Sequence, residues 1–406
     1  MDYLHDSLMN KQESSVTPIL IVAGESSGES HAAGLVREIR RQLPTKSLEF
    51  FGSGGEQMAA EGVHLLLDVS GLGAIGPWAA LANAGNYLWL YRELFKQAKT
   101  RKPALAILVD FPDFNLRLAS KLKELGIPIC YFISPQIWAW RSSRVKQIKR
   151  NVDLMLVIFP FEEEFYKSHG VTVHYVGNPS ASRLRSSASK REEYRDTEVS
   201  SRHQALVALL PGSRKKEVEL ILPVMLDAAH YVWKSHPARF LLVKAPAVGK
   251  EEIEMIYRNW MDKTESKIDL EVCVSNSHEV LSQADCAMVK SGTSTLEAMI
   301  SEVPFAMVYR ISYLSWLLLR PFVQTDTYCL ANLVAGQQIV PEFIQKNATG
   351  ERIGAYMLSL LTKSGKRIEM KRLLKQARGR LGEKDAYVEG ARKIATSFFL
   401  EGNRRA

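Results

Sequence analysis

Two aspartates follow an apolar run in the segment AILVDFPDFN, residues 106–115. A carboxylate is costly to bury without partners, so Asp110 at the tip of a core-like strand needs an explanation. Asp110 is either a general base held in a cleft or part of an Asx-turn. Asp113, which follows Pro112, is placed to cap or open the next helix. A metal bound by both aspartates is disfavoured, because no histidine or third carboxylate lies nearby in the sequence.

Two short turns in the second half of the chain have residues that could bind phosphate. In each, a glycine lets the backbone approach a ligand, and the following helix N-terminus favours an anion. Arginine in the first turn can donate to two phosphate oxygens at once. The turn residues are Gly212, Ser213 and Arg214 in the first, and Ser291, Gly292 and Thr293 in the second. An ordinary helix cap explains either turn alone, but two together favour a nucleotide diphosphate, with Glu297 placed to accept ribose hydroxyls.

The first strand of the chain leads into AGESSGES, residues 23–30. This segment matches neither the G-x-G-x-x-G pattern nor the P-loop pattern, which disfavours an ordinary NAD or ATP site. Glu25 instead puts a carboxylate at a strand end, on the same edge of the predicted sheet as Asp110. We therefore expect both carboxylates to face one cleft.

The elements that must position these residues alternate between apolar strands and amphipathic helices. Such alternation predicts parallel sheets covered on both faces, here in two doubly wound, Rossmann-like α/β domains. Ligands bind in such domains at the carboxyl ends of the strands. The expected division is a loose tail (1–16), a first domain (17–182), a Ser-rich charged linker (183–204), a second domain (205–345) and basic C-terminal helices (346–406).

The bulk composition is that of a water-soluble globular chain of 406 residues with a net charge of +9. Residues 363–406 hold 13 Lys and Arg against 5 Asp and Glu, so this segment carries +8 (13 − 5). A solvated helix face, nucleic-acid binding or contact with anionic lipid would explain that charge, and charge alone favours the solvated face. No apolar run is long enough to span a membrane, and the first residues do not resemble a signal peptide. The four cysteines show no metal-ligand spacing and are expected to be reduced core residues.

Aromatic residues gather in two segments, residues 76–95 and 134–149. Trp78, Trp89, Trp138 and Trp140 could pack in the core, line a groove for an acyl chain or lie at a membrane surface. The residue types alone leave these alternatives open.

The ordered set of motifs in residues 19–361 resembles the lipid-A-disaccharide synthase family. The shared segments are AGESSGES, GSGGEQMAAEG, VDFPDFN, SPQIWAWR, FPFEEEFY, YVGNPS, LLPGSRKKEVE, SGTSTLEAM, YR and LANLVAG. Members are inverting glycosyltransferases with two Rossmann-like domains facing a cleft, the GT-B fold. Two positions depart from the usual pattern: Glu29 stands where aspartate is common, and Ser182 replaces an aspartate near Asn178.

The resemblance implies transfer of 2,3-diacylglucosamine from its UDP derivative to 2,3-diacylglucosamine 1-phosphate, giving a β-1,6 disaccharide and UDP. It implies that Asp110 is the catalytic base and that Arg214 acts near the leaving diphosphate. Glu25, Asp113, Asn115 and Asn332 match candidate substrate-binding positions. No metal or other cofactor is implied.

The family likeness also makes a membrane surface a credible partner for the tryptophans and the basic tail. It implies peripheral attachment to the cytoplasmic face of the inner membrane and a homodimer that exchanges C-terminal segments; nucleic acid is not an expected partner. The competing hypotheses are another GT-B enzyme, such as a UDP-N-acetylglucosamine transferase or 2-epimerase, and a non-catalytic binder of lipid or nucleotide.

Overall fold

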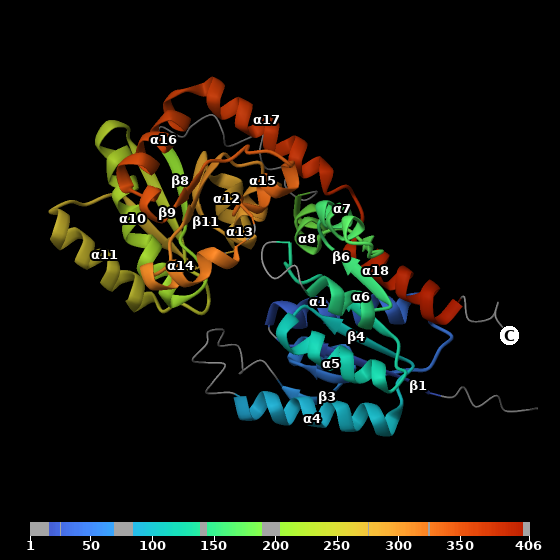
Figure 1. Ribbon diagram of the computed structural model, residues 1–406. Coiled ribbons are helices and arrows are strands. Elements are labelled where there is room, and N and C mark those ends of the chain that lie inside the picture. Colours follow the sequence, from blue (N-terminus) through green and yellow to red (C-terminus); the bar gives the residue numbers. More distant parts are fainter. Residues whose placement is uncertain are drawn as a thin grey trace, which may run out of the picture.

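The computed structural model describes residues 16–24, 26–68, 84–138, 144–188, 204–274, 276–323 and 325–400. Glu25, Trp78 and Trp140 lie outside these ranges, as do the first 15 residues and most of the predicted linker. The described chain forms two α/β domains, each built on one parallel sheet (Figure 1).

The first domain has a seven-stranded parallel sheet in the order β3-β2-β1-β4-β5-β6-β7. Three of its inner strands are fully buried, as expected for apolar runs covered on both faces. The strands are β1 (Thr17–Ala23), β2 (Leu48–Gly54), β3 (His64–Asp68), β4 (Leu105–Val109), β5 (Ile129–Phe132), β6 (Leu154–Val157) and β7 (His174–Tyr175).

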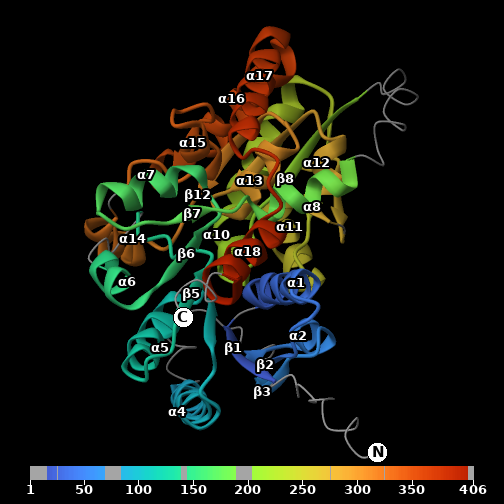
Figure 2. The same ribbon diagram turned by 90° about the vertical axis from the view of Figure 1, so that its right-hand side faces the viewer.

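Side chains that alternate along β1 enter two separate cores. Ile19 and Ile21 pack under α1 and α18, whereas Leu20 and Val22 pack under α4, α5 and α6 on the opposite face (Figure 2). The helices of this domain are α1 (Ser26–Gln42), α2 (Glu56–Ala60), α4 (Ala84–Arg101), α5 (Pro112–Glu124), α6 (Val145–Asn151), α7 (Pro160–Ser168), α8 (Pro179–Ala188) and, from the C-terminus, α18 (Ala386–Ile394).

The second domain repeats the arrangement with a six-stranded parallel sheet in the order β10-β9-β8-β11-β12-β13. Its strands are β8 (Ala205–Leu210), β9 (Ala238–Val243), β10 (Leu270–Cys273), β11 (Cys286–Lys290), β12 (Phe305–Tyr309) and β13 (Glu342–Ile344). The helices are α10 (Lys215–Ser235), α11 (Lys250–Thr264), α12 (Ser277–Gln283), α13 (Thr293–Ile300), α14 (Tyr313–Leu319), α15 (Leu330–Ala335), α16 (Gly350–Thr362) and α17 (Ser364–Arg380). Single turns of 3-10 helix lie at Arg320–Phe322 and Gln345–Asn347, and a π-helical turn, Ala395–Leu400, follows α18.

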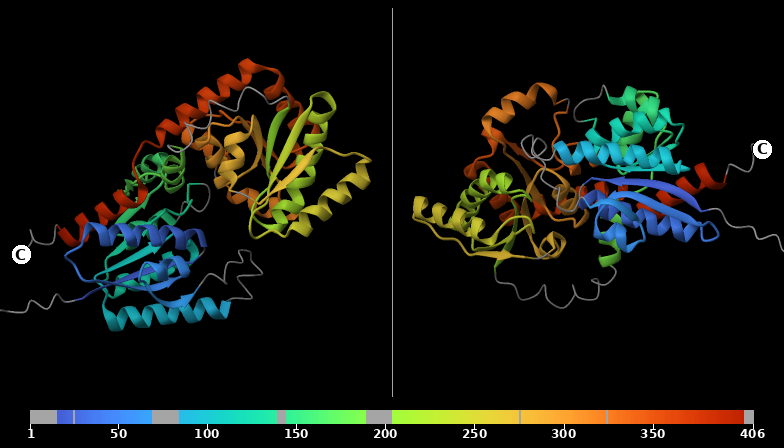
Figure 3. Two further views of the ribbon diagram at one scale, coloured as in Figure 1. Left: turned by 180° about the vertical axis from the view of Figure 1, so that it is seen from behind. Right: turned by 90° about the horizontal axis from the view of Figure 1, so that it is seen from below.

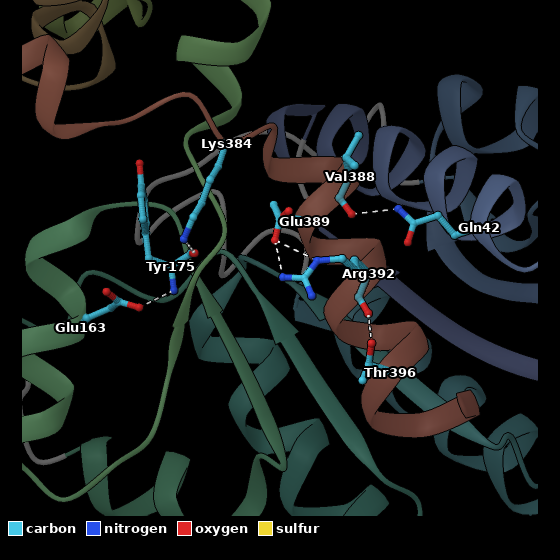
Figure 4. Close-up of polar contacts among 8 residues, drawn as sticks. All are labelled: Gln42, Glu163, Tyr175, Lys384, Val388, Glu389, Arg392 and Thr396. Carbon is cyan, nitrogen blue, oxygen red and sulfur yellow. Dashed lines mark hydrogen bonds and ion pairs between the residues drawn. The ribbon is translucent and has the colours of Figure 1, made fainter. Parts of the chain in front are cut away.

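The end of the chain returns from the second domain to the first through α17 and α18 (Figure 3). The Tyr175 hydroxyl donates to the carbonyl of Leu381 at 2.7 Å, and Lys384 Nζ donates to the carbonyl of Tyr175 at 3.2 Å. Farther along, Gln42 Nε2 on α1 donates to the carbonyl of Val388 at 2.9 Å (Figure 4). These contacts fasten α18 to the first domain of its own chain.

The predicted fold class is confirmed, and two short strands are additions to it. β3 and β13 have only five and three residues, and most of their side chains are half-buried. Residues Glu342–Ile344, just before the predicted C-terminal helices (346–406), form the edge strand β13 by pairing with β12. None of the four cysteines is in a disulfide, and three are buried.

Candidate active site

Both sheets change winding direction between two neighbouring strands. In the first sheet this switch point lies between β1 and β4, where Ala23 pairs with Val109. In the second it lies between β8 and β11, where Leu210 pairs with Val289. Open α/β sheets bind ligands outside the strand ends at such points. Asp110 follows β4, and the two phosphate-type turns follow β8 and β11, so all three segments occupy switch points.

The backbone at Asp110 is held in an unusual conformation. Asp110 and Phe111 both have φ of +49°, in the left-handed region that non-glycine residues seldom adopt. The Asp110 N–H donates to the carbonyl of Phe132 at 3.0 Å, and its own carbonyl accepts from the Tyr131 hydroxyl at 2.5 Å. Strained residues persist where the surroundings overdetermine them, often at functional sites.

The Asp110 carboxyl group, at the carboxyl end of β4, has a shifted pKa. Burial raises the pKa of its carboxyl group, and a hydrogen bond from the backbone of Phe111 offsets part of that rise. The Asx-turn alternative fails because it needs an N–H two residues on, and Pro112 has none. A carboxylate with a raised pKa is a stronger base than one with an ordinary pKa, which suits proton abstraction.

Asn115 supports the same turn from inside. Its side chain is fully buried, and Nδ2 donates to the carbonyls of Val109 and Asp110 at 3.2 and 2.9 Å. We expected Asn115 to bind substrate directly. Its burial and these two bonds instead give it a positioning role for Asp110.

Phe111 fixes the other side of the turn. Its ring stacks on Phe114 at 5.2 Å and lies 5.7 Å from the ring of Tyr87 on α4. A Cβ on Gly24 would come within 2.2 Å of this ring, so only glycine fits there. The loop after β1 and the loop after β4 are therefore packed directly together.

Asp113 has a different environment from Asp110. It lies in the first turn of α5, as the sequence predicts, and its largely exposed carboxylate pairs with Arg144 at the start of α6. This pair joins two helices on the same side of the sheet. The two aspartates are therefore not a symmetrical pair.

The first phosphate-type turn is built around Glu217 of α10. Gly212 has φ of +128°, and the N–H of Ser213 donates to Glu217 Oε2 at 3.3 Å. Arg214 is the N-cap residue, with Nη1 3.7 Å from Glu217 Oε1, and its side chain is 56% exposed. The exposed guanidinium remains accessible to a ligand at the N-terminus of α10.

The second turn connects β11 to α13. Gly292 has φ of +134°, Thr293 begins the helix, and Ser291 Oγ donates to the carbonyl of Tyr328 at 2.7 Å. Glu297, one turn into α13, accepts from Ser277 Oγ at 2.7 Å. Its carboxylate is thus oriented by the neighbouring helix α12.

Arg183 links this turn to the first domain. Its guanidinium, on α8, lies 3.8 Å from Glu297 Oε1. On the other side, burial and then the charge of Arg183 lower the pKa of His31 on α1 to about 4. Because α1 follows β1 and α13 follows β11, this arginine lies between helices that begin at the two switch points.

Two expected functional residues turn out to be packed into the structure. Asn332 is buried, and its amide makes four hydrogen bonds, to the backbone of Ile339 and Val340 and to Glu342. It therefore holds the segment between α15 and β13 and has no free group for substrate. Trp138 packs edge-on against Phe161 at 5.2 Å, which is a core role and not a membrane-facing one.

Trp89 is the remaining tryptophan candidate that the structure describes. It lies on α4 with 49% of its surface exposed, next to Leu88 at 50%. Among the described residues, no group of three or more His, Cys, Asp or Glu side chains could hold a metal ion.

Three groups escaped the sequence-based prediction. Glu162 is buried on α7, where it accepts from the N–H groups of Ile158 and Phe159, and burial raises its pKa to about 8. Glu217 and Lys290 lie 2.9 Å apart. Lys290 could have been predicted as a site residue, because it stands directly before the Ser-Gly-Thr turn in the sequence.

Comparisons with known proteins agree with these motifs. The model of the lipid-A-disaccharide synthetase family matches residues 19–394. A lipid-A-disaccharide synthase from Myxococcus xanthus is 40% identical over 377 residues, covering 93% of this chain and 96% of that protein. One from Koribacter versatilis is 36% identical over 390 residues, covering 95% and 99%.

Solved structures of low sequence identity share the fold. A putative UDP-N-acetylglucosamine 2-epimerase from Listeria monocytogenes superposes with a TM-score of 0.62 at 11% identity, covering 96% of this chain and 97% of that one. The calicheamicin glycosyltransferase CalG4 gives 0.58 at 12% identity, covering 97% and 100%. These likenesses establish the GT-B fold, and the family match over almost the whole length shows that the chain belongs to the lipid-A-disaccharide synthetase family.

Proposed function

We propose that this chain is a lipid-A-disaccharide synthase that joins UDP-2,3-diacylglucosamine to 2,3-diacylglucosamine 1-phosphate with inversion at the anomeric carbon. The observation that carries the proposal is the Asp110 carboxylate, which is half-buried at the switch point of the first sheet and whose pKa is raised by desolvation, in a chain of this family. The products are a β-1,6-linked disaccharide lipid and UDP.

The chemical step is a single displacement. The 6-hydroxyl oxygen of the acceptor forms a bond to the anomeric carbon while the bond from that carbon to the diphosphate oxygen breaks. Asp110 takes the hydroxyl proton, a role typically worth about 10²–10⁴-fold in rate. Its raised pKa supports this assignment, because a more basic carboxylate has a greater driving force for proton transfer.

Charge that develops on the leaving diphosphate must be stabilised from the second domain. Arg214 and the N-termini of α10 and α13 supply positive groups at that switch point. Glu297, already oriented by Ser277, is placed to accept the ribose hydroxyls. With these donors we propose that the reaction needs no metal ion and no other cofactor.

The test is UDP release from the purified protein with each lipid substrate alone and with both together. We expect release only with both, and a product whose anomeric proton shows the large coupling constant of a β-linkage. Conversion of UDP-N-acetylglucosamine to its 2-epimer would favour the epimerase alternative. Tight binding of both lipids without turnover would favour a non-catalytic binder.

We also propose that the protein binds peripherally to an anionic membrane, at the cytoplasmic face of the inner membrane. Among the described residues, no helix is long and apolar enough to cross a bilayer. Support comes from α14, where four large apolar side chains are between 59% and 79% exposed: Tyr313, Leu314, Leu317 and Leu318. Arg320 follows directly, with its guanidinium 5.9 Å from the Trp316 ring. Apolar residues flanked by arginine are typical of interfacial helices.

Removing apolar surface from α14 tests this attachment. The double variant Leu314→Ser, Leu318→Ser should bind vesicles containing phosphatidylglycerol at least about tenfold more weakly at low salt, because two leucines leave the acyl region. The control variant Met255→Ser, Val274→Ser changes side chains that are 56% and 70% exposed elsewhere on the second domain. Equal co-sedimentation of the wild type and the α14 variant would contradict the assignment.

A homodimer with exchanged C-terminal segments stays a prediction. In the single chain, α18 packs on α1 through the Val388 carbonyl and the Tyr387 hydroxyl, which lies 2.9 Å from His31 Nδ1. The same surface of α1 would receive α18 of a second copy after an exchange.

A further inference from the structure

Lys290 is the last residue of β11 and stands directly before the second phosphate-type turn. Its Nζ lies 2.9 Å from Glu217 Oε1, and the two side chains are only 20% and 16% exposed. Strand β11 pairs with β8, so the end of β11 lies beside the start of the first turn. None of the roles assigned above uses this lysine.

The ammonium group of Lys290 lies between the two turns. It contacts Glu217 of α10, the helix that follows the first turn, and it lies 3.5 Å from where a Cβ on Gly292 of the second turn would stand. Both turns reach this point because β8 and β11 flank the switch point. A group bound across the two turns would therefore meet this lysine.

The Glu217 carboxylate lies close to two cationic side chains and a backbone N–H. It lies 2.9 Å from Lys290 Nζ and 3.7 Å from Arg214 Nη1, and it accepts from the N–H of Ser213 at 3.3 Å. Two cations thus face one carboxylate, which leaves these three groups with a net charge of +1. Two cations and a backbone N–H are also donors that suit a diphosphate.

We propose that Lys290 binds the diphosphate of the nucleotide together with Arg214, and that Glu217 pairs with Lys290 while the site has no nucleotide. This inference rests on the proposed function, since it needs a UDP-sugar at the second switch point. A diphosphate carries more negative charge than a single carboxylate and therefore competes for the lysine. The compact ammonium charge of Lys290 then stabilises the leaving UDP, whereas the planar guanidinium of Arg214 donates hydrogen bonds to it.

The alternative is that the pair only fastens α10 to β11. In that case its loss should lower the stability of the domain and weaken every ligand alike. A role in binding phosphate predicts a loss that depends on the phosphates of the ligand. The two roles therefore separate when ligands with and without phosphate are compared.

The experiment measures the affinity of the full-length protein for UDP and for uridine by calorimetric titration and by competition. For Lys290→Met we expect UDP affinity to fall about 10- to 100-fold, the range for loss of one charged hydrogen bond, with uridine affinity changed less than about threefold. Lys290→Arg should restore most of the loss. Glu217→Gln should bind UDP at least as tightly as the wild type, because the competing charge is gone.

The control is Lys250→Met, which removes the same charge from a 65% exposed side chain on α11 that pairs with Glu254. It should bind UDP as the wild type does. Unchanged UDP affinity in Lys290→Met would overturn the inference while leaving the proposed function intact, as would an equal loss for UDP and uridine. A wild-type protein that binds no UDP would instead refute the proposed function itself.

Discussion

Replacing Asp110 by asparagine removes the charge of the proposed base and leaves its backbone conformation in place. Asp110 has φ of +49°, and asparagine is among the few residues that tolerate this left-handed region. The hydrogen bonds from Tyr131 and Asn115 reach the backbone carbonyl of residue 110 and do not depend on its side chain. Asp110→Asn therefore isolates the chemistry of the carboxylate.

Turnover should fall by about 10²–10⁴-fold, the usual contribution of a general base. At about 1.4 kcal/mol for each factor of ten, this corresponds to a barrier higher by about 2.7–5.5 kcal/mol. The donor KM should change little, because the nucleotide is bound by the second domain. The assay is UDP release at saturating concentrations of both lipids.

The same substitution should stabilise the protein at high pH. Burial raises the pKa of Asp110 above its ordinary value of 3.8, so the folded state holds a proton that the unfolded state releases. Stability is therefore lost as the pH rises from the unfolded pKa through the folded one. Asparagine cannot ionise, so the variant should melt at a higher temperature than the wild type at pH 8, and the difference should shrink towards pH 4.

Asp110→Ala is the matched control for the backbone. It removes the same carboxylate but puts alanine at φ of +49°, which costs about 1–2 kcal/mol. It should match Asp110→Asn in lost turnover and be less stable. Turnover of Asp110→Asn within tenfold of the wild type would refute the general-base assignment, and an unchanged melting temperature at pH 8 would refute the burial argument.

Two further predictions concern the packing around the site. Gly24→Ala puts a Cβ 2.2 Å from the Phe111 ring. We expect this variant to lose about 1–3 kcal/mol of stability in urea unfolding and to lose turnover as well. A wild-type rate would show that the Phe111 loop does not position Asp110. Burial raises the pKa of Glu162 to about 8, so wild-type stability should fall as the pH rises from about 4.5 to 8, and Glu162→Gln should flatten this dependence in thermal melts between pH 5 and 9. A parallel decline in both proteins would assign it to other groups.

The sequence predicted most of the strands, because fully buried strands are continuous apolar runs. It missed β3 and β13, since both are short, half-buried strands at the edges of their sheets. The turns after β4, β8 and β11 were also predictable, because glycine, proline and capping residues act within a few positions. Asp113 in the first turn of α5 is an example of such local control.

Other features depend on partners that are distant in the chain. Asn115 and Asn332 were plausible ligand groups from the sequence. Only the fold shows that backbone carbonyls accept from Asn115 Nδ2 and that both ends of the Asn332 amide are hydrogen-bonded. The sequence left Trp138 as a candidate for membrane contact, whereas in the fold its ring packs against the ring of Phe161. A side chain can bind a ligand only if the fold leaves its polar groups without other partners. Those partners can be distant in the sequence, so neighbouring residues do not reveal them.

The sequence by itself determined the two-domain α/β class, the family and the presence of a carboxylate at the end of β4, because these follow from periodicity and ordered motifs. Only the tertiary structure decided that Asp110 is half-buried in a left-handed turn and that Lys290 faces Glu217. The pKa of a carboxylate and the pairing of a lysine depend on what surrounds them. In this fold those surroundings come from segments that meet only when the strands pair.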